Sequence, residues 1–228
     1  MNSNRKTATI VGVLYIIGTI AGILSLVFLG NSLSDPSYLV KASENQNQIV
    51  TASLLVLLMG FSLAMMSVVL FPILKRQNEA LALGVVLFRG ALEAVMYIIL
   101  VICWLLLLTV SQEYVQAGAP DASHFQTLGA VLLKASDQIV PILNIVFSLG
   151  ALMIYYVFHQ SKLLPRWISV WGLIGAVLYL VSGLSGMFGV SLGFLMAPLA
   201  LQEMVMAVWL IVKGFDGSAI TSLSAKQI

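Results

Sequence analysis

The stretch of sequence that decides the fold is residues 80–110, which read ALALGVVLFRGALEAVMYIILVICWLLLLTV. Arg89 and Glu93 are the only charged side chains in it. An α-helix rises 1.5 Å per residue, so the stretch makes a helix of about 46 Å, against about 30 Å for the hydrocarbon core of a bilayer. It therefore predicts a transmembrane helix that tilts or protrudes from the membrane.

Further apolar runs are also long enough to cross a bilayer, since about 20 residues suffice. Together with residues 80–110 they are residues 8–30, 49–73, 138–159, 167–188 and 193–213. Backbone polar groups in lipid must be paired within their own segment, so long runs of Leu, Ala and Met predict helices and not barrel strands. We predict an all-α polytopic membrane protein, a six-transmembrane-helix bundle. Residues 1–215 form the membrane domain and residues 216–228 a mobile cytoplasmic tail.

The composition agrees with lipid as the main solvent of the chain. Of 228 residues, 60% are hydrophobic and 9% are charged, whereas soluble domains average about 25% charged residues. The net charge of +2 gives no indication of nucleic-acid binding. The single cysteine, Cys103, cannot form an intrachain disulfide. His124 and His159 are isolated near opposite faces of the predicted bundle, so we expect no metal site, and no motif indicates a cofactor or an enzyme.

Lysine and arginine residues are distributed unevenly between the two sides of the predicted bundle. Lys41 and Lys134 fall on one side, and Arg89 lies within a helix. The other side carries Arg5, Lys6, Lys75, Arg76, Lys162, Arg166, Lys213 and Lys226. By the positive-inside rule this basic side is cytoplasmic, and an even number of helices then places both termini in the cytoplasm. Residues 8–30 exceed the apolar core of a signal peptide, so we interpret them as a retained first helix.

Residues 111–137 form the longest predicted connection, on the side opposite to the termini. From Ser123 to Asp137, apolar residues recur at a spacing of three or four, which is typical of a helix. We expect a short amphipathic helix on the outer membrane surface, or an extension of the fourth spanning helix. An interfacial segment is favoured over a lid across an outward-facing cavity.

Arg89, Glu93 and Glu203 are ionisable residues inside predicted spanning segments. Each costs about 2.5–3.5 kcal/mol in lipid, so such groups usually face protein or water. Arg89 and Glu93 are i, i+4 neighbours on one helix face and can pair. One interpretation is a structural clasp that Glu203 joins, holding the third and sixth helices together. The other is a substrate or proton site, with Glu203 as the titrating carboxylate and Arg89 as an anion anchor. Arg89 could also reach the cytoplasmic interface.

Two prolines mark candidate helix breaks. Pro198 lies in the sixth segment and predicts a kink about one turn before Glu203. Pro141, in the fourth segment, stands with Asp137 and Asn144 in a secondary polar patch toward the outer side. We interpret Asp137 as a cap or first-turn charge of the fourth helix.

Three stretches together resemble a known family. They are ALALGVVLFRGALEA (residues 80–94), LPRWISVWGLIG (residues 164–175) and EMVMAVWLIVKGF (residues 203–215). In this order they resemble the bacterial membrane family called domain of unknown function 4386 (DUF4386), over nearly the whole chain. The resemblance implies a multi-helix protein of the bacterial inner membrane. It implies no activity and no site residues.

The leading hypothesis on function is a small transporter or permease-like protein with a polar site between the third and sixth helices. It depends on the carboxylate near the membrane midplane, the proline-broken helix and the lack of a soluble domain. The alternative is a non-transporting membrane protein, such as a scaffold, a stress-response factor or an accessory subunit, in which the buried charges are structural. The expected partners are the lipid bilayer, a small molecule of unknown identity and, as a further option, a second copy of the chain.

Overall fold

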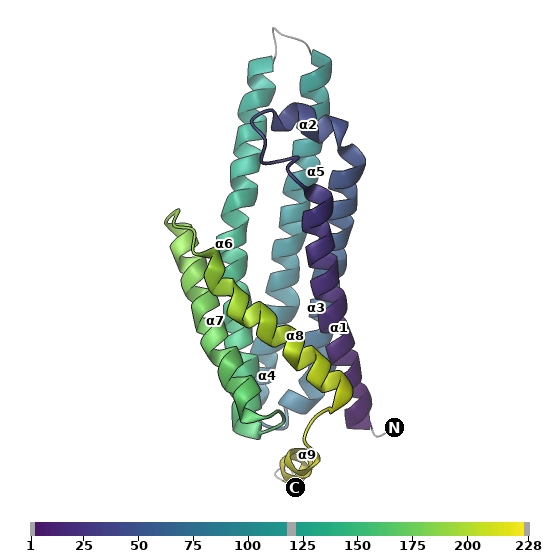
Figure 1. Cartoon of the computed structure of the whole chain (residues 1–228), viewed down its shortest axis with the longest axis vertical. Coiled ribbons are helices and arrows are strands. Elements are labelled where there is room, and N and C mark those ends of the chain that lie inside the picture. The colour runs from purple at the N-terminus through teal and green to yellow at the C-terminus, as the bar shows by residue number, and fades with distance from the viewer. Residues whose placement is uncertain (1–2, 118–121, 226–228) are drawn as a thin grey trace.

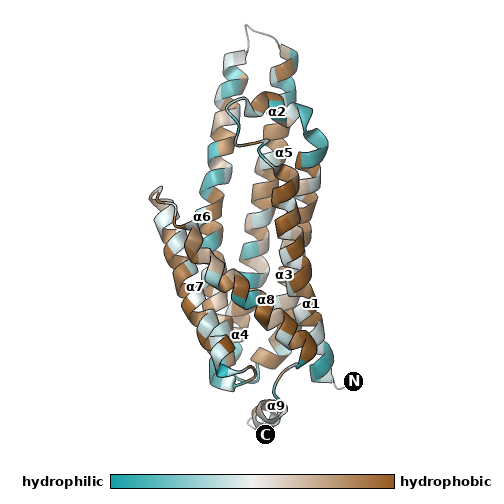
Figure 2. Cartoon of the chain, viewed as in Figure 1, coloured by the Kyte–Doolittle hydropathy of each residue, from teal (hydrophilic) through white to brown (hydrophobic). Residues whose placement is uncertain are grey.

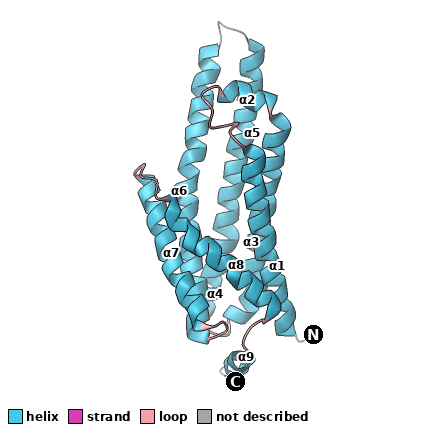
Figure 3. Ribbon diagram, viewed as in Figure 1, coloured by secondary structure: helices cyan, strands magenta, loops and turns pink. Residues whose placement is uncertain are grey.

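The computed structural model describes residues 3–117 and 122–225. All the elements in these ranges are helical (Figure 3). The α-helices are α1 (Ser3–Leu29), α2 (Tyr38–Glu44), α3 (Gln46–Leu74), α4 (Glu79–Val85), α5 (Glu93–Ala117), α6 (Ala122–Ser161), α7 (Arg166–Met187), α8 (Ala197–Val212) and α9 (Gly217–Ala225). A π-helix, η1 (Val86–Leu92), joins α4 to α5, and a 3-10 helix, η2 (Gly193–Met196), precedes α8.

Six helices are long and apolar enough to cross a membrane, which confirms the predicted number of spans. They are Ser3–Leu29, Gln46–Leu74, Glu79–Ala117, Ser123–Ser161, Arg166–Met187 and Gly193–Val212. Hydrophobic residues make up much of these helices (Figure 2), and many large apolar side chains are exposed on their outside; Leu26, for example, is 68% exposed. Such exposure is unfavourable in water and is accounted for by contact with lipid.

The third and fourth spans are much longer than the sequence predicts. The third runs over 39 residues without interruption and α6 over 40, about 60 Å each. The segment from Ser123 to Asp137 is therefore the first part of α6, which agrees with the predicted extension and not with a separate surface helix. The ends of α5 and α6 stand above the rest of the bundle (Figure 1).

The two chain ends lie at the same end of the bundle, which we call the termini end; the opposite end is the distal end (Figure 1). At the termini end, the guanidinium of Arg5 donates hydrogen bonds to the carbonyls of Ile211 and Val212, at 2.7 and 2.8 Å. These carbonyls close α8 and lack helical partners of their own. The contact fastens the start of α1 to the end of α8. Lys226 lies outside the described residues.

The distal half and the termini half of the bundle are built from different sets of helices. α1 packs along α3, and α6 packs along both α5 and α7. Helix α8 crosses the bundle obliquely, from α7 to α1, in the termini half (Figure 1). In the distal half, the buried core consists of side chains from α2, α3, α5 and α6 with Leu33 of the turn after α1, and Leu29 of α1 packs against it. The short helix α2 is held there because Ser111 of α5 donates a hydrogen bond to the carbonyl of Leu39.

Part of the tail beyond residue 215 is helical. In α9, Ala219 and Leu223 are buried against the core of the termini half. Asp216 precedes the helix, and its carboxylate accepts hydrogen bonds from the Ser218 hydroxyl and from the Ala219 amide. These bonds hold the pKa of Asp216 below its ordinary value, as for a typical N-cap. The mobility of the tail stays a prediction.

Candidate functional site

Arg89 lies in the middle of the π-helix η1, whose hydrogen bonds span five residues instead of four. One extra residue per turn shifts the face that the following side chains present to the bundle. Short π-helical segments occur frequently at functional sites. The π-helix is not among the features predicted from the sequence; Gly90, directly after the buried arginine, is a weak signal of it because glycine disfavours the interior of an α-helix.

The Arg89 guanidinium connects two carboxylates that lie on different helices. Its Nη1 donates to both oxygens of Glu93, at 3.1 and 2.9 Å, and its Nη2 donates to Glu203 Oε1 at 3.1 Å. The Tyr97 hydroxyl donates to Glu93 Oε1 at 3.3 Å. We call Arg89, Glu93 and Glu203 the charged triad. It joins the third span to the sixth, and Arg89 does not reach an interface because it is buried.

Aromatic rings from other helices complete the surroundings of Arg89. Its guanidinium carbon lies 4.2 Å from the ring centroid of Phe147 in α6 and 5.9 Å from that of Tyr15 in α1. Cation–π attraction is strongest where water is excluded. Phe147 in turn packs against Tyr179 of α7, with ring centroids 4.5 Å apart. Helices α1, α6 and α7 thus all contribute to the pocket of one positive charge.

Helices pack unusually closely at Arg89 because two glycines leave room for its backbone and side chain. A Cβ on Gly150 of α6 would lie 2.5 Å from Arg89 Cγ, and one on Gly90 would lie 2.7 Å from Ser67 Oγ of α3. Both separations are below contact distance, so neither position tolerates a larger residue without movement. The buried arginine therefore depends on glycine in the helix that packs against it.

The charged triad is unbalanced, because it contains one guanidinium and two carboxylates. The side chains of Arg89 and Glu93 are 0% and 1% exposed, whereas that of Glu203 is 12% exposed. Arg89 contacts Oε1 of Glu203 and not Oε2. Glu203 also lines a cavity of about 140 Å³ whose walls include Tyr97, Phe147 and Tyr179. Glu203 is therefore the member of the triad that a molecule in the cavity can reach.

The secondary patch is connected to this cavity. Asp137, Pro141 and Asn144 line a second cavity of about 520 Å³ between α6, the end of α7 and η2. Asn144 also lines the small cavity beside Glu203. Asp137 was predicted to cap the fourth helix or to lie in its first turn, and this prediction is wrong. Helix α6 begins at Ala122, and Asp137 lies well inside it.

The two prolines occupy different positions in their helices. Pro141 lies inside α6. Pro198 lies in the first turn of α8, directly after the 3-10 helix η2. A missing amide hydrogen has little cost there, since first-turn amides have no helical partner. The irregularity before Glu203 is thus a change from 3-10 to α-helix at the start of α8, and not a kink within a continuous helix.

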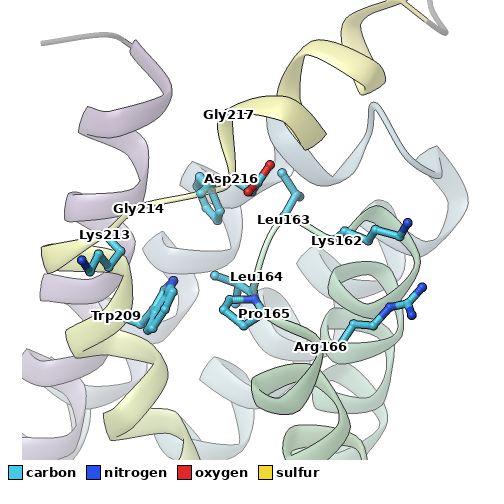
Figure 4. Close-up of a pocket in the computed structure, with 11 residues that line it drawn as sticks. Lys162, Leu163, Leu164, Pro165, Arg166, Trp209, Lys213, Gly214, Asp216 and Gly217 are labelled. Carbon is cyan, nitrogen blue, oxygen red and sulfur yellow. The ribbon is translucent and has the colours of Figure 1, made fainter.

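A pocket at the termini end is less suited to a ligand. Its volume is about 510 Å³, and Trp209, Leu164 and Pro165 line its centre. The basic side chains of Lys162 and Arg166 point away from Lys213 on the other side, as Figure 4 shows. Cations that diverge in this way do not form one anion site. Within residues 3–117 and 122–225, no group of three His, Cys, Asp or Glu side chains is placed to bind a metal.

Six spans around a buried triad of charges define a multi-pass helical membrane protein. The chain belongs to the family described as Domain of unknown function (DUF4386), whose family model matches residues 10–214. The match confirms the resemblance of the three sequence stretches and places all of the charged triad inside the family region. No curated protein and no solved structure matches the chain.

The close packing at Gly150 generates a first prediction. Gly150→Ala should lower the free energy of unfolding by about 1–3 kcal/mol, because the new Cβ overlaps the Arg89 side chain. Thermal unfolding of the purified protein in detergent measures the change. Gly217→Ala is the matched control, since a Cβ there meets no atom within 4 Å. Equal melting temperatures for the two variants would contradict the packing argument.

A second prediction concerns the pairing within the triad. Arg89→Gln should cost about 3–5 kcal/mol, because it leaves two buried carboxylates without their cation. Adding Glu93→Gln to this variant should recover part of the loss, since one of the carboxylates is then neutral. Chemical unfolding in mixed micelles completes the double-mutant cycle, with exposed Lys6→Gln as the charge control. Additive losses from the two substitutions would argue against a direct pair.

Proposed function

We propose that the protein is a small transporter whose working centre is the charged triad, with Glu203 as the group that gains and loses a proton or a substrate. The observation that carries the proposal is that Glu203 combines a surplus negative charge with exposure to an internal cavity. Arg89 and Glu93 neutralise one another and have no such access.

The charge balance supports this role. With both carboxylates ionised, the triad has one uncompensated negative charge within the membrane, and a buried unpaired charge costs several kcal/mol. A proton on Glu203 or a cation beside it removes the cost. A site that takes up one positive charge at a time is what a coupled transporter needs, because proton and substrate can then replace one another.

The local helix geometry gives further support. Both spans that carry the triad are irregular near it: η1 contains Arg89, and the junction of η2 with α8 precedes Glu203 by about two turns. In many transporters, interrupted helices line the substrate site near the midplane of the bilayer. Irregular turns also allow a helix to change direction without unfolding.

The alternative function, a non-transporting scaffold, stress-response protein or accessory subunit, is favoured by a different observation. The pair of Arg89 and Glu93 is fully buried, and Arg89 Nη1 donates to both oxygens of Glu93, as in a purely structural clasp. The two functions differ in what Glu203 does, because a clasp keeps Glu203 ionised and paired at all times. We further propose that the protein works in the bacterial inner membrane, in contact with lipid, alone or as a homo-oligomer.

A third prediction separates the two functions through Glu203 itself. In reconstituted membranes, infrared difference spectra recorded between neutral and acidic pH should contain a carboxyl band that is absent in Glu203→Gln, while the variant stays folded. Glu79→Gln, which removes an exposed carboxylate paired with Lys75 at 3.2 Å, is the control and should keep the band. A clasp gives no such band, and Glu203→Gln then destabilises the fold.

The orientation of the bundle gives a fourth prediction. We propose that the termini end faces the cytoplasm, which is supported by the excess of Lys and Arg on that side. Alkaline phosphatase fused after residue 228 should be inactive, and a fluorescent protein at the same place should fluoresce. Phosphatase inserted at Ser34, in the turn between α1 and α2, should be active. The reverse pattern would show that the bundle is inverted.

A further inference from the structure

A larger cavity lies in the distal half of the bundle, outside the charged triad. Its volume is about 540 Å³, within the range of about 300–1,000 Å³ that is typical of small-molecule sites. Residues of α1, α3, α5, α6, α7 and α8 line it, together with Leu33 and Ser34 of the turn after α1. Ile23 and Leu26, which form one wall, are 57% and 68% exposed on the outer surface of α1. The cavity therefore opens sideways, toward the lipid, and not only toward the water at the end of the bundle.

This cavity leads to Glu203. It shares Thr19, Met59, Tyr179 and Ala200 with the small cavity that Glu203 lines. Shared walls mean that the two spaces adjoin, so a molecule that enters from the lipid side can extend toward the carboxylate. Ala200 lies one helical turn before Glu203 on α8 and stands where the two cavities meet.

The charged side chains that line the combined cavity are all negative. Asp137 lines the larger space and Glu203 the smaller one, and neither lining contains a Lys, Arg or His side chain. Arg89 does not contribute a positive surface, because its side chain is 0% exposed and paired with Glu93. An anion would meet two carboxylates and no exposed positive side chain. A cation is complementary to the cavity.

The remaining walls are largely apolar and aromatic, with a few hydroxyl side chains among them. Leu, Ile, Val and Met side chains make up half of the larger lining, and Thr19, Ser25, Ser34 and Ser136 supply the hydroxyls. Rings of Trp104, Tyr97, Phe147 and Tyr179 stand along the route to Glu203, and aromatic faces attract cations. A small hydrated ion would gain nothing from the apolar half of these walls, whereas an organic cation with a hydrophobic body would bury its apolar surface there.

We propose that the cavity binds a lipophilic organic cation, whose charge lies beside Glu203 and whose apolar body fills the space between α1, α5 and α6. The inference rests on the proposed function and specifies its substrate class. Binding releases the proton of Glu203 to water as the cation takes its place, so the charge of the cavity is unchanged. The charged or titratable groups that face Glu203 are Arg89 of η1, Glu93 of α5, Tyr15 of α1, Tyr155 of α6 and Tyr179 of α7.

The test uses the full chain in lipid nanodiscs, with tetraphenylphosphonium as the probe. Tetraphenylborate, an anion of the same shape, is the matched control for hydrophobic partition. Equilibrium dialysis against empty nanodiscs measures binding, and a pH indicator in weak buffer measures released protons. Wild-type protein should bind the cation at least about tenfold more tightly than the anion and should release protons on binding.

Two variants identify the site. Glu203→Gln should lower the affinity for the cation about tenfold or more and abolish proton release. Ala200→Trp, which fills the junction of the cavities and leaves every charge in place, should weaken binding in the same way. Glu79→Gln removes an exposed carboxylate far from the cavity and should bind as the wild type does.

The outcomes distinguish the substrate class from the proposed function. If the infrared band of Glu203 is present but the cation and the anion bind equally, the substrate class is wrong and the proposed function stands. If the cation binds equally to the wild type, Glu203→Gln and Ala200→Trp, the cavity is not its site. If neither probe binds and Glu203 shows no band, both proposals fall. If both probes bind, and Ala200→Trp reduces their binding but Glu203→Gln does not, the cavity is a site for a neutral lipid chain and the proposed substrate class is wrong.

Discussion

The arrangement of this bundle depends on one buried positive charge. Arg89 is removed from both water and lipid, and the cost of that burial is offset by two carboxylates on different helices and by the Phe147 ring. Each partner constrains a backbone. Glu93 must follow one π-helical turn later, α6 must have glycine at position 150, and α8 must cross the bundle where Glu203 meets the guanidinium.

Several features could be predicted from the sequence because they depend on local composition. Six long apolar runs give six spans, and the i, i+4 spacing of Arg89 and Glu93 predicts their pairing in any regular helix. The third charge, Glu203, stood out because carboxylates are rare in apolar segments. The contact between Glu203 and Arg89 depends on tertiary packing. It could be suggested from the sequence only because a buried charge needs a partner.

Other features were beyond sequence reasoning for physical reasons. Arg89, at the centre of the π-helix, packs against Gly150 and Phe147, which are about 60 residues away in the chain and could not be placed beside it from the sequence. The ends of α5 and α6 extend past the apolar runs because they pack against each other and against α2, where polar residues continue the helices. Pro198 predicts a kink when the sixth segment is taken as one continuous α-helix. In the structure, the α-helix α8 begins at Ala197, directly after the 3-10 helix η2, so Pro198 lies in its first turn.

The length of the third span has a mechanical consequence. From Arg89 to Ala117 the helix extends about 42 Å, and the turn at its base is the π-helix. A rotation of about 5° at that turn would move the end of α5 sideways by about 4 Å, so a small change in the helix around the guanidinium would be enlarged along its length. Because α2 and α6 pack on the same helix, such a rotation would also move α2 and the start of α6.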